Sequence, residues 1–307
     1  MISLSRDQIA ALLDIRSLAP CIEATYRASS AREINLPQVG HIELPERNDD
    51  SHIKFGQRRG DPSFVIKVAT GFPDTPSEIG RTSNGLSLVL SAHTGEVQAM
   101  LHDEMLLTNV RTAIGSAIAT RALTHPDATR LLIVGTGAQA EHQIQAHREL
   151  LNRPLEISVW GRSPEKAKAV AERNNTQHAS VLAAACATAD IIVTVTAASK
   201  PLIMNDWIAP GTHITAVGAD APGKHELDAA LIERADHLVA DSPHQCLHHG
   251  DLSILSSERH QDVVQLGTVL DSGLTRSHEA VTIVDLTGTA AQEIAIAQWI
   301  LDARSAE

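Results

Sequence analysis

Short apolar runs alternate with longer amphipathic segments in the second half of the chain. The apolar runs predict strands at 131–134, 156–160, 190–196, 213–218, 236–240 and 281–286. Between them, apolar residues at helical spacing predict helices at about 138–151, 164–174, 227–234 and 257–270. This alternation predicts an α/β fold with a doubly wound parallel sheet of the Rossmann type.

The first hundred residues have a different pattern. One helix is expected to open at Ser5-Arg6-Asp7, and a second is expected from about Ala19 to Ala31. Short apolar or alternating runs predict strands at 34–44, 52–55, 64–70, 86–91 and 97–101, with a hairpin turn at 92–96. This region therefore predicts an antiparallel or mixed sheet.

Two apolar helices are expected outside these patterns. The stretch from Leu106 to about Thr124 predicts a helix leading from the first region into the second, capped by Asp103 or Thr108. The segment from about Thr289 to Arg304 predicts a last helix, which is expected to fold back on the first region.

Composition limits the classes of partner and compartment. A chain of 307 residues can hold one large or two medium domains, and its net charge of -12 argues against nucleic acid or an anionic membrane. There is no apolar run of about eighteen residues, and the start lacks a signal peptide's apolar core. Cys21, Cys186 and Cys246 lie far apart, which favours a reducing, cytoplasmic setting.

The stretch Leu131-Leu132-Ile133-Val134-Gly135-Thr136-Gly137-Ala138-Gln139-Ala140 has the G-x-G-x-x-A order of a dinucleotide-binding unit. Gly135 permits a tight turn, and Gly137 lets the backbone approach a pyrophosphate. Ala140 is small enough for the helix to pack on the strand. The helix N-terminus would supply N–H donors to the anion.

The next strand indicates which nicotinamide cofactor is preferred. It ends at Gly161-Arg162-Ser163, without the acidic residue that hydrogen-bonds the ribose in NAD-selective units. Arg162 could pair with a 2′-phosphate and Ser163 could donate to it. NADP(H) is therefore preferred and NAD(H) remains possible, while the alternative makes Arg162 a solvated turn residue.

Three charged residues are candidates for binding or catalysis. Lys67 lies inside the apolar run 64–69, which favours a carboxylate partner or an anionic ligand over an exposed strand face. Arg111 lies in an apolar helix, where it either holds an anion between domains or reaches solvent. Asp220 follows the predicted strand 213–218, and is either a proton donor or a turn residue.

The histidines of 244–249 lack a matching ligand set, so no metal site is predicted and a loop is expected there.

Taken together, these motifs resemble the ornithine cyclodeaminase/mu-crystallin family over nearly the whole chain. The motifs that carry the resemblance are Lys67 in 64–71, Arg111-Thr112-Ala113, Gly135–Ala140, Gly218–Leu227 and Asp285–Ala290. The resemblance implies a second, α+β domain for substrate binding and dimerisation, built from both chain ends. We expect this domain at 1–110 with 288–307 and the dinucleotide-binding domain at 111–287.

The resemblance also implies residue roles. Lys67 would bind the substrate carboxylate, Arg111 would hold substrate or cofactor, and Asp220 would be the acid/base. The expected cofactor residues are Thr82, Arg111, Thr112, Gly135, Gly137, Ala138, Gln139, Gly161, Arg162, Ser163, Thr196, Lys224 and Thr287. Family members usually carry a carboxylate-binding arginine in a Pro-x-Arg segment, but residues 36–41 lack one, so Lys54, Arg58 or Arg59 is expected to replace it. Gly288 is expected beside the substrate.

The expected activity is NAD(P)H-dependent reduction of a cyclic or linear α-imino acid, such as pyrroline-2-carboxylate, to an L-amino acid. The cofactor would supply the hydride, while Lys67, Arg111 and Asp220 would orient and polarise the substrate. One alternative is an NAD-dependent ornithine cyclodeaminase, a lyase that gives proline and ammonia. Another is a mu-crystallin-like protein that binds a small ligand. The expected assembly is a homodimer.

Overall fold

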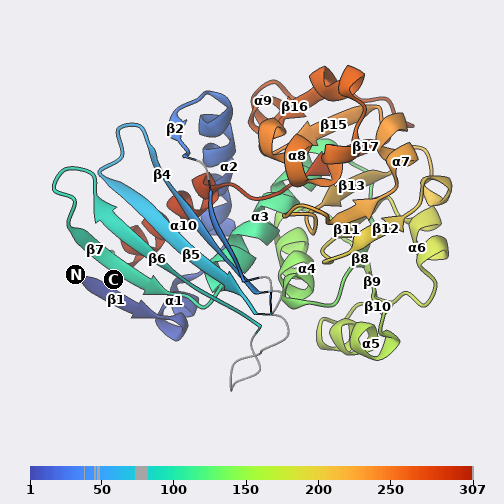
Figure 1. Ribbon diagram of the computed structural model, residues 1–307. Coiled ribbons are helices and arrows are strands. Elements are labelled where there is room, and N and C mark those ends of the chain that lie inside the picture. Colours follow the sequence, from blue (N-terminus) through green and yellow to red (C-terminus); the bar gives the residue numbers. More distant parts are fainter. Residues whose placement is uncertain (38, 45, 47–48, 73–81, 306–307) are drawn as a thin grey trace. The chain divides into compact units, whose positions relative to one another are not determined.

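The computed structural model describes residues 1–37, 39–44, 46, 49–72 and 82–305 (Figure 1). Contacts divide the chain into two compact units, which are described separately: Met1–Arg111 with Thr289–Glu307 (unit 1), and Thr112–Gly288 (unit 2). Each boundary lies one residue from the one expected from the sequence. Among the described residues, no helix is both long and apolar enough to span a membrane.

Unit 2 contains an eight-stranded sheet in the order β10-β9-β8-β11-β13-β17-β15-β16, and every pair is parallel. Its strands are β8 (Arg130–Val134), β9 (Glu156–Trp160), β10 (Gln177–His178), β11 (Ile191–Thr194), β13 (His213–Ala216), β15 (His237–Ala240), β16 (Val263–Gln265) and β17 (Thr282–Asp285). Most of their residues are buried, as a sheet covered on both faces requires. The predicted Rossmann-type α/β fold is confirmed.

The other elements of unit 2 correct several predictions. Its helices are α4 (Ala138–Leu150), α5 (Pro164–Arg173), α6 (Leu182–Thr188), α7 (Ala229–Arg234), α8 (Pro243–His249) and α9 (Leu266–Ser272). The expected helix 257–270 is wrong, because β-branched Val263 and Val264 extend as β16 between a 3-10 segment and α9. The expected loop at 244–249 is also wrong, since Pro243 opens α8. A small parallel pair joins β12 (Ser199–Ile203) to β14 (His225–Leu227), which takes the start of the helix expected at 227.

Unit 1 contains a seven-stranded mixed sheet in the order β1-β7-β6-β5-β4-β2, with β3 also paired to β4. The strands are β1 (Ile2–Ser5), β2 (Ile34–Asn35), β3 (Gly40–Leu44), β4 (Asp49–Arg58), β5 (Ser63–Gly71), β6 (Ser83–Ser91) and β7 (Val97–His102). Only β1 runs parallel to its partner, β7, and β1 was not predicted. The predicted hairpin turn at 92–96 joins β6 and β7, with Gly95 at a φ of 74°.

The helices of unit 1 come from both chain ends. They are α1 (Arg6–Leu12), α2 (Ile15–Ser30) and α10 (Ala290–Ser305), while α3 (Leu106–Leu123) leads into unit 2. Helix α10 contacts α2, β4 and β5, and buries Ile294, Ile296 and Ile300. The C-terminal segment therefore packs on the first region, as its apolar residues predicted.

Candidate active site and nucleotide loop

Lys67 is buried in the middle of β5 and is paired with Asp103. Its side chain is 1% exposed, and Nζ donates to Asp103 Oδ1 at 3.1 Å and Oδ2 at 3.0 Å. Asp103 follows β7, and its Oδ2 also accepts from the backbone N–H of Leu107 at the start of α3. Burial raises the pKa of Asp103 and the charge of Lys67 opposes that rise. The expected carboxylate partner exists, and it fixes the direction of the ammonium group.

Arg111 is buried in α3 rather than extended to solvent. Its Nε donates to Glu293 Oε1 at 3.1 Å, and Nη1 donates to Gln292 Oε1 at 2.9 Å. Burial acts to raise the pKa of Glu293, but Arg111, Lys67 and Lys54 outweigh it and lower the pKa below its ordinary value. Both partners lie on α10, so the C-terminal helix positions Arg111.

Lys54 is the direct neighbour of Lys67 across the β4–β5 ladder. Residues paired in this way point to the same face of a sheet. Three cationic side chains, from β4, β5 and α3, therefore act on the single carboxylate of Glu293. Asp103 and Glu293 balance two of these three cationic charges, and the net positive charge that is left suits a small carboxylate ligand. Arg58 instead lies near Glu33 at 3.6 Å, and Arg59 is exposed in the turn after β4. Gln38 of the expected Pro-x-Arg segment lies outside the described residues.

The glycine loop of unit 2 has the geometry that its sequence predicted. Gly135 has a φ of 139°, and a Cβ there would lie 2.8 Å from the carbonyl oxygen of Val195. Gly137 caps α4 in extended conformation, and nothing lies within 4 Å of a Cβ built on it. Ala140 is fully buried against the sheet. The open space at Gly137, beside the N-terminus of α4, fits a dinucleotide pyrophosphate. Ala138 and Gln139 form the first turn of that helix.

Residues 161–163 lie at the carboxyl end of β9, the strand that pairs with β8. Gly161 is buried, with a Cβ position only 2.5 Å from Thr136 Cγ2, so a larger residue there would have to displace the Thr136 side chain. Arg162 is exposed. Ser163 caps α5: its Oγ accepts from Lys166 N at 3.2 Å and donates to Glu165 at 2.9 Å. Its hydroxyl is thus engaged in capping, and Arg162 is the residue able to turn towards a ligand.

Asp220 lies beyond the carboxyl end of β13 and forms an ion pair with Lys224. The two atoms, Asp220 Oδ1 and Lys224 Nζ, are 2.5 Å apart, and the side chains are 55% and 32% exposed. The sequence assigned these residues separate roles, as acid/base and as cofactor ligand. The structure brings them together in the turn that leads to β14.

Glu226, on β14, is a buried carboxylate that joins the ends of two parallel strands. Its Oε1 accepts from the backbone N–H and the hydroxyl of Thr196, both at 2.7 Å. Its Oε2 accepts from the hydroxyl of Thr194 at 2.7 Å and from Gly218 N at 2.8 Å. Gly218 lies two positions before Asp220, so Glu226 fixes the backbone that leads to the expected acid/base. Thr196, expected beside the cofactor, is held by the same carboxylate.

Two aspartates lie beside Glu226 in the buried interior of unit 2. Asp251 Oδ1 accepts from the N–H groups of Glu226 and Leu227 at 2.8 and 2.9 Å, and Asp285 Oδ2 accepts from Leu252 N at 2.9 Å. Burial, reinforced by Asp251, raises the pKa of Glu226 to about 7. Burial likewise raises the pKa of Asp251 to about 6 and the pKa of Asp285 well above its ordinary range.

Asp241, which follows β15, holds the segment after β17. Its Oδ1 accepts from the Thr287 hydroxyl at 3.3 Å, and its Oδ2 accepts from Gly288 N at 2.7 Å. Gln245 of α8 donates to the Thr287 hydroxyl at 2.9 Å. Asp241 and Gln245 thereby hold Thr287 and Gly288, both expected at the site, just beyond the carboxyl end of β17.

The remaining predicted residues are Thr82 and Thr112. Thr82 is exposed just before β6, and its carbonyl accepts from Phe72 N at 2.7 Å. Thr112 is half-buried on α3, next to Arg111.

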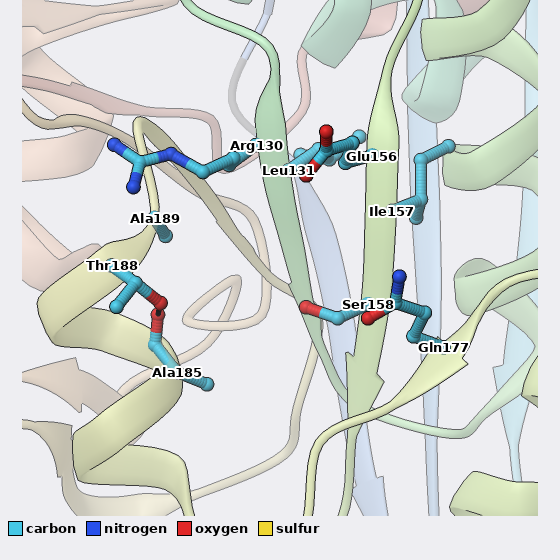
Figure 2. Close-up of a pocket in the computed structure, with 9 residues that line it drawn as sticks. All are labelled: Arg130, Leu131, Glu156, Ile157, Ser158, Gln177, Ala185, Thr188 and Ala189. Atoms are coloured by element: carbon cyan, nitrogen blue, oxygen red, sulfur yellow. Dashed lines mark hydrogen bonds between the residues drawn. The ribbon is translucent and has the colours of Figure 1, made fainter.

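The hollow drawn in Figure 2 lies at the amino ends of strands β8 and β9 of the parallel sheet. Its lining includes Arg130 and Glu156, the first residues of β8 and β9. Ligands of open α/β sheets bind at the carboxyl ends of the strands, where Gly135 and Gly137 lie. This hollow is therefore separate from the nucleotide loop.

Replacement of Glu226 by Gln is expected to destabilise unit 2 by about 1–3 kcal/mol. Each carboxylate oxygen accepts one backbone N–H, and the glutamine NH2 would face one of those donors instead. Because the pKa of Glu226 is raised in the folded state, its contribution to stability is full at low pH and is lost as pH rises through about 7. As pH rises from about 4.5 to 7, the variant should therefore lose less stability than the unaltered protein does.

Urea unfolding at several pH values measures both effects. The control is Glu141→Gln, which alters an exposed glutamate paired with Arg173. An unchanged pH slope in the Glu226 variant would refute this account of Glu226.

Comparison with known proteins connects the whole chain to one family. The model of the ornithine cyclodeaminase/mu-crystallin family matches residues 2–307. A protein of Rhizobium meliloti (strain 1021) named as a dehydrogenase is 37% identical over 297 residues, covering 92% of this chain and 89% of its own. The Delta(1)-pyrroline-2-carboxylate reductase of Paracoccus denitrificans (strain Pd 1222) is 33% identical over 249 residues, covering 77% of this chain and 78% of its own.

A solved structure gives the same result at the level of the fold. The iminosuccinate reductase of Paracoccus denitrificans, in complex with NAD+, superposes with a TM-score of 0.89. It is 26% identical, and the match covers 100% of this chain and 97% of that one. The resemblance inferred from the motifs is thus confirmed: the chain belongs to the ornithine cyclodeaminase/mu-crystallin family.

Proposed function

We propose that this protein reduces a cyclic or linear α-imino acid to an L-amino acid with NAD(P)H. The observation that carries the proposal is the buried Lys67, whose ammonium is fixed by Asp103 on a face that also carries Lys54. A permanently placed cation of this kind suits a substrate carboxylate. A Delta(1)-pyrroline-2-carboxylate reductase that is 33% identical over 249 residues, or 77% of this chain, supports the choice of an imino acid.

In this proposal the protein's residues bind and orient the reactants. Lys67, with Arg111, anchors the carboxylate, so that one face of the imine carbon is presented to the nicotinamide. Asp220 stabilises the positive charge on the imine nitrogen and holds its proton. The backbone N–H groups of Gly137 and the first turn of α4 would hold the pyrophosphate, since the space at Gly137 is open. The cofactor supplies the hydride when it is bound.

A lyase remains the second candidate, because the family to which the chain belongs is named for ornithine cyclodeaminase as well as mu-crystallin. A direct assay separates the candidates: protein, NADPH and pyrroline-2-carboxylate are mixed and the absorbance of the reduced cofactor is followed. Its consumption supports the reductase. Release of ammonia and proline from ornithine with catalytic NAD+ would instead support the lyase. If neither reaction takes place, the result supports a protein that only binds a small ligand.

For the cofactor we propose NADP(H) over NAD(H), based on the exposed Arg162 and the lack of an acidic residue at 161–163. Arg162→Ala should raise the Kd for NADPH by about 10- to 150-fold and leave NADH nearly unchanged, since a charge-assisted phosphate bond contributes about 1.5–3 kcal/mol. Titration of protein fluorescence with each cofactor measures this. Equal effects on the two cofactors would show that Arg162 does not bind the 2′-phosphate.

We also propose a homodimer in a reducing compartment. A dimeric alanine dehydrogenase superposes on this fold with a TM-score of 0.91, and Cys21, Cys186 and Cys246 are free thiols. Light scattering coupled to size-exclusion chromatography tests the assembly: a mass of one chain would contradict it.

A further inference from the structure

The β3–β4 hairpin of unit 1 brings together two histidines and an aspartate that the sequence keeps apart. His41 on β3 is the direct ladder partner of His52 on β4, and Asp50 precedes His52 by one alternation of the strand. Alternate residues of a strand, and partners across an antiparallel ladder, point to the same face. His41, Asp50 and His52 therefore share one face of the hairpin.

The distances within this trio suit a tetrahedral metal ion. His52 Nε2 lies 3.1 Å from Asp50 Oδ2, and His41 Nε2 lies 4.0 Å from the same oxygen. One ligand atom from each residue falls within 4.8 Å of the others. Zinc bonds of about 2.0–2.2 Å place tetrahedral ligand atoms about 3.3 Å apart, a value between the two observed distances. The imidazole rings stack with centroids 4.4 Å apart, so the two side chains lie side by side on this face.

Accessibility and the surrounding charges favour the same ligand. The side chains of His41, Asp50 and His52 are 34%, 39% and 28% exposed, so an ion can enter without unfolding of the hairpin. Glu43, the ladder partner of Asp50, places Oε1 3.6 Å from His41 Nδ1. A carboxylate on that side of the ring favours the tautomer that leaves Nε2 free for a metal, and adds negative charge beside a cation.

We propose that His41, Asp50 and His52 bind one divalent transition-metal ion, with water completing the coordination. Zn²⁺ is the best-suited ion, because two imidazoles and one carboxylate match its ligand preference, whereas Mg²⁺ and Ca²⁺ prefer oxygen ligands. The site lies in unit 1 and is independent of the proposed reductase activity. A second group, His125 with Asp127 and His278, lies in turns of unit 2 and lacks a strand ladder to fix its geometry.

The test is isothermal titration of the full chain with ZnCl2 after treatment with a chelator. One Zn²⁺ per chain is expected, and His41→Ala and His52→Ala should each weaken binding by more than about tenfold. His93→Ala, which alters an exposed histidine of the β6–β7 turn, should bind as the unaltered protein does. Circular dichroism confirms that each variant is folded.

Cobalt substitution supplies a readout that does not depend on affinity alone. Co²⁺ bound by the trio should give the visible absorption of a tetrahedral site, and that absorption should disappear in the His41→Ala/His52→Ala double variant. The proposal is overturned if the unaltered protein binds no Zn²⁺, or if binding survives in the double variant. It is equally overturned if His125→Ala abolishes the binding instead.

Discussion

Asp220→Asn should lower kcat for imine reduction by about 10²–10⁴-fold while the Kd for NADPH stays nearly unchanged. The asparagine keeps the shape of the side chain but carries neither the negative charge that stabilises an iminium nor a carboxylate that exchanges its proton. Asp220 is 55% exposed beyond the end of β13, so the substitution leaves the core of unit 2 intact. Steady-state kinetics with pyrroline-2-carboxylate, together with a cofactor titration, measure the two parameters.

A matched control separates catalysis from the loss of a surface ion pair. Asp262 is 46% exposed and lies 2.9 Å from Arg259, much as Asp220 lies beside Lys224. Asp262→Asn should retain the activity of the unaltered protein. If Asp220→Asn also retains it, Asp220 takes no part in the proton chemistry, and the proposed mechanism loses its acid/base.

Asp103→Ala should destabilise unit 1 by about 3–5 kcal/mol, the largest effect on stability that we expect. Lys67 is 1% exposed, so removal of Asp103 leaves a buried ammonium without the carboxylate that holds it. The same substitution removes the acceptor of Leu107 N at the start of α3. Urea unfolding followed by circular dichroism measures the loss.

A double variant distinguishes loss of the ion pair from a general packing defect. Lys67→Met combined with Asp103→Leu replaces the pair by apolar groups, and such replacements of buried pairs are often neutral. The double variant should therefore be more stable than Asp103→Ala, while losing affinity for a carboxylate substrate. An Asp103→Ala variant within about 1 kcal/mol of the unaltered protein would contradict a buried, coupled pair.

The parallel sheet of unit 2 could be predicted because its signals are local. The run 131–134 is apolar throughout and is followed by a glycine turn and a helix, and the run 236–240 is followed by a helix that Pro243 opens. Strand β1 had no such signal, since its apolar/polar alternation extends over only four residues and its partner, β7, lies far along the chain. The helix expected at 257–270 fails for a related reason: helical spacing there competes with two adjacent β-branched valines.

The candidate site was predictable only in part. Lys67 and Arg111 stood out as charges in apolar surroundings, but their partners could not be identified from spacing, because Arg111 pairs with Glu293 from the other end of the chain. Gln292 and Glu293 give the same signal, two polar residues in an apolar helix, but the spacing does not connect them with Arg111. Glu226 and Asp251 gave none, since acidic residues beside a turn are ordinarily solvated and only the folded sheet buries them.

The most direct test of the central proposal follows the hydride itself. Pyrroline-2-carboxylate is incubated with the protein and NADPH carrying deuterium at the transferred position, and the product is analysed by NMR and chiral chromatography. The account predicts L-proline with deuterium on Cα, formed in equal amount to the cofactor oxidised. Proline without deuterium, or no consumption of the cofactor, would contradict it.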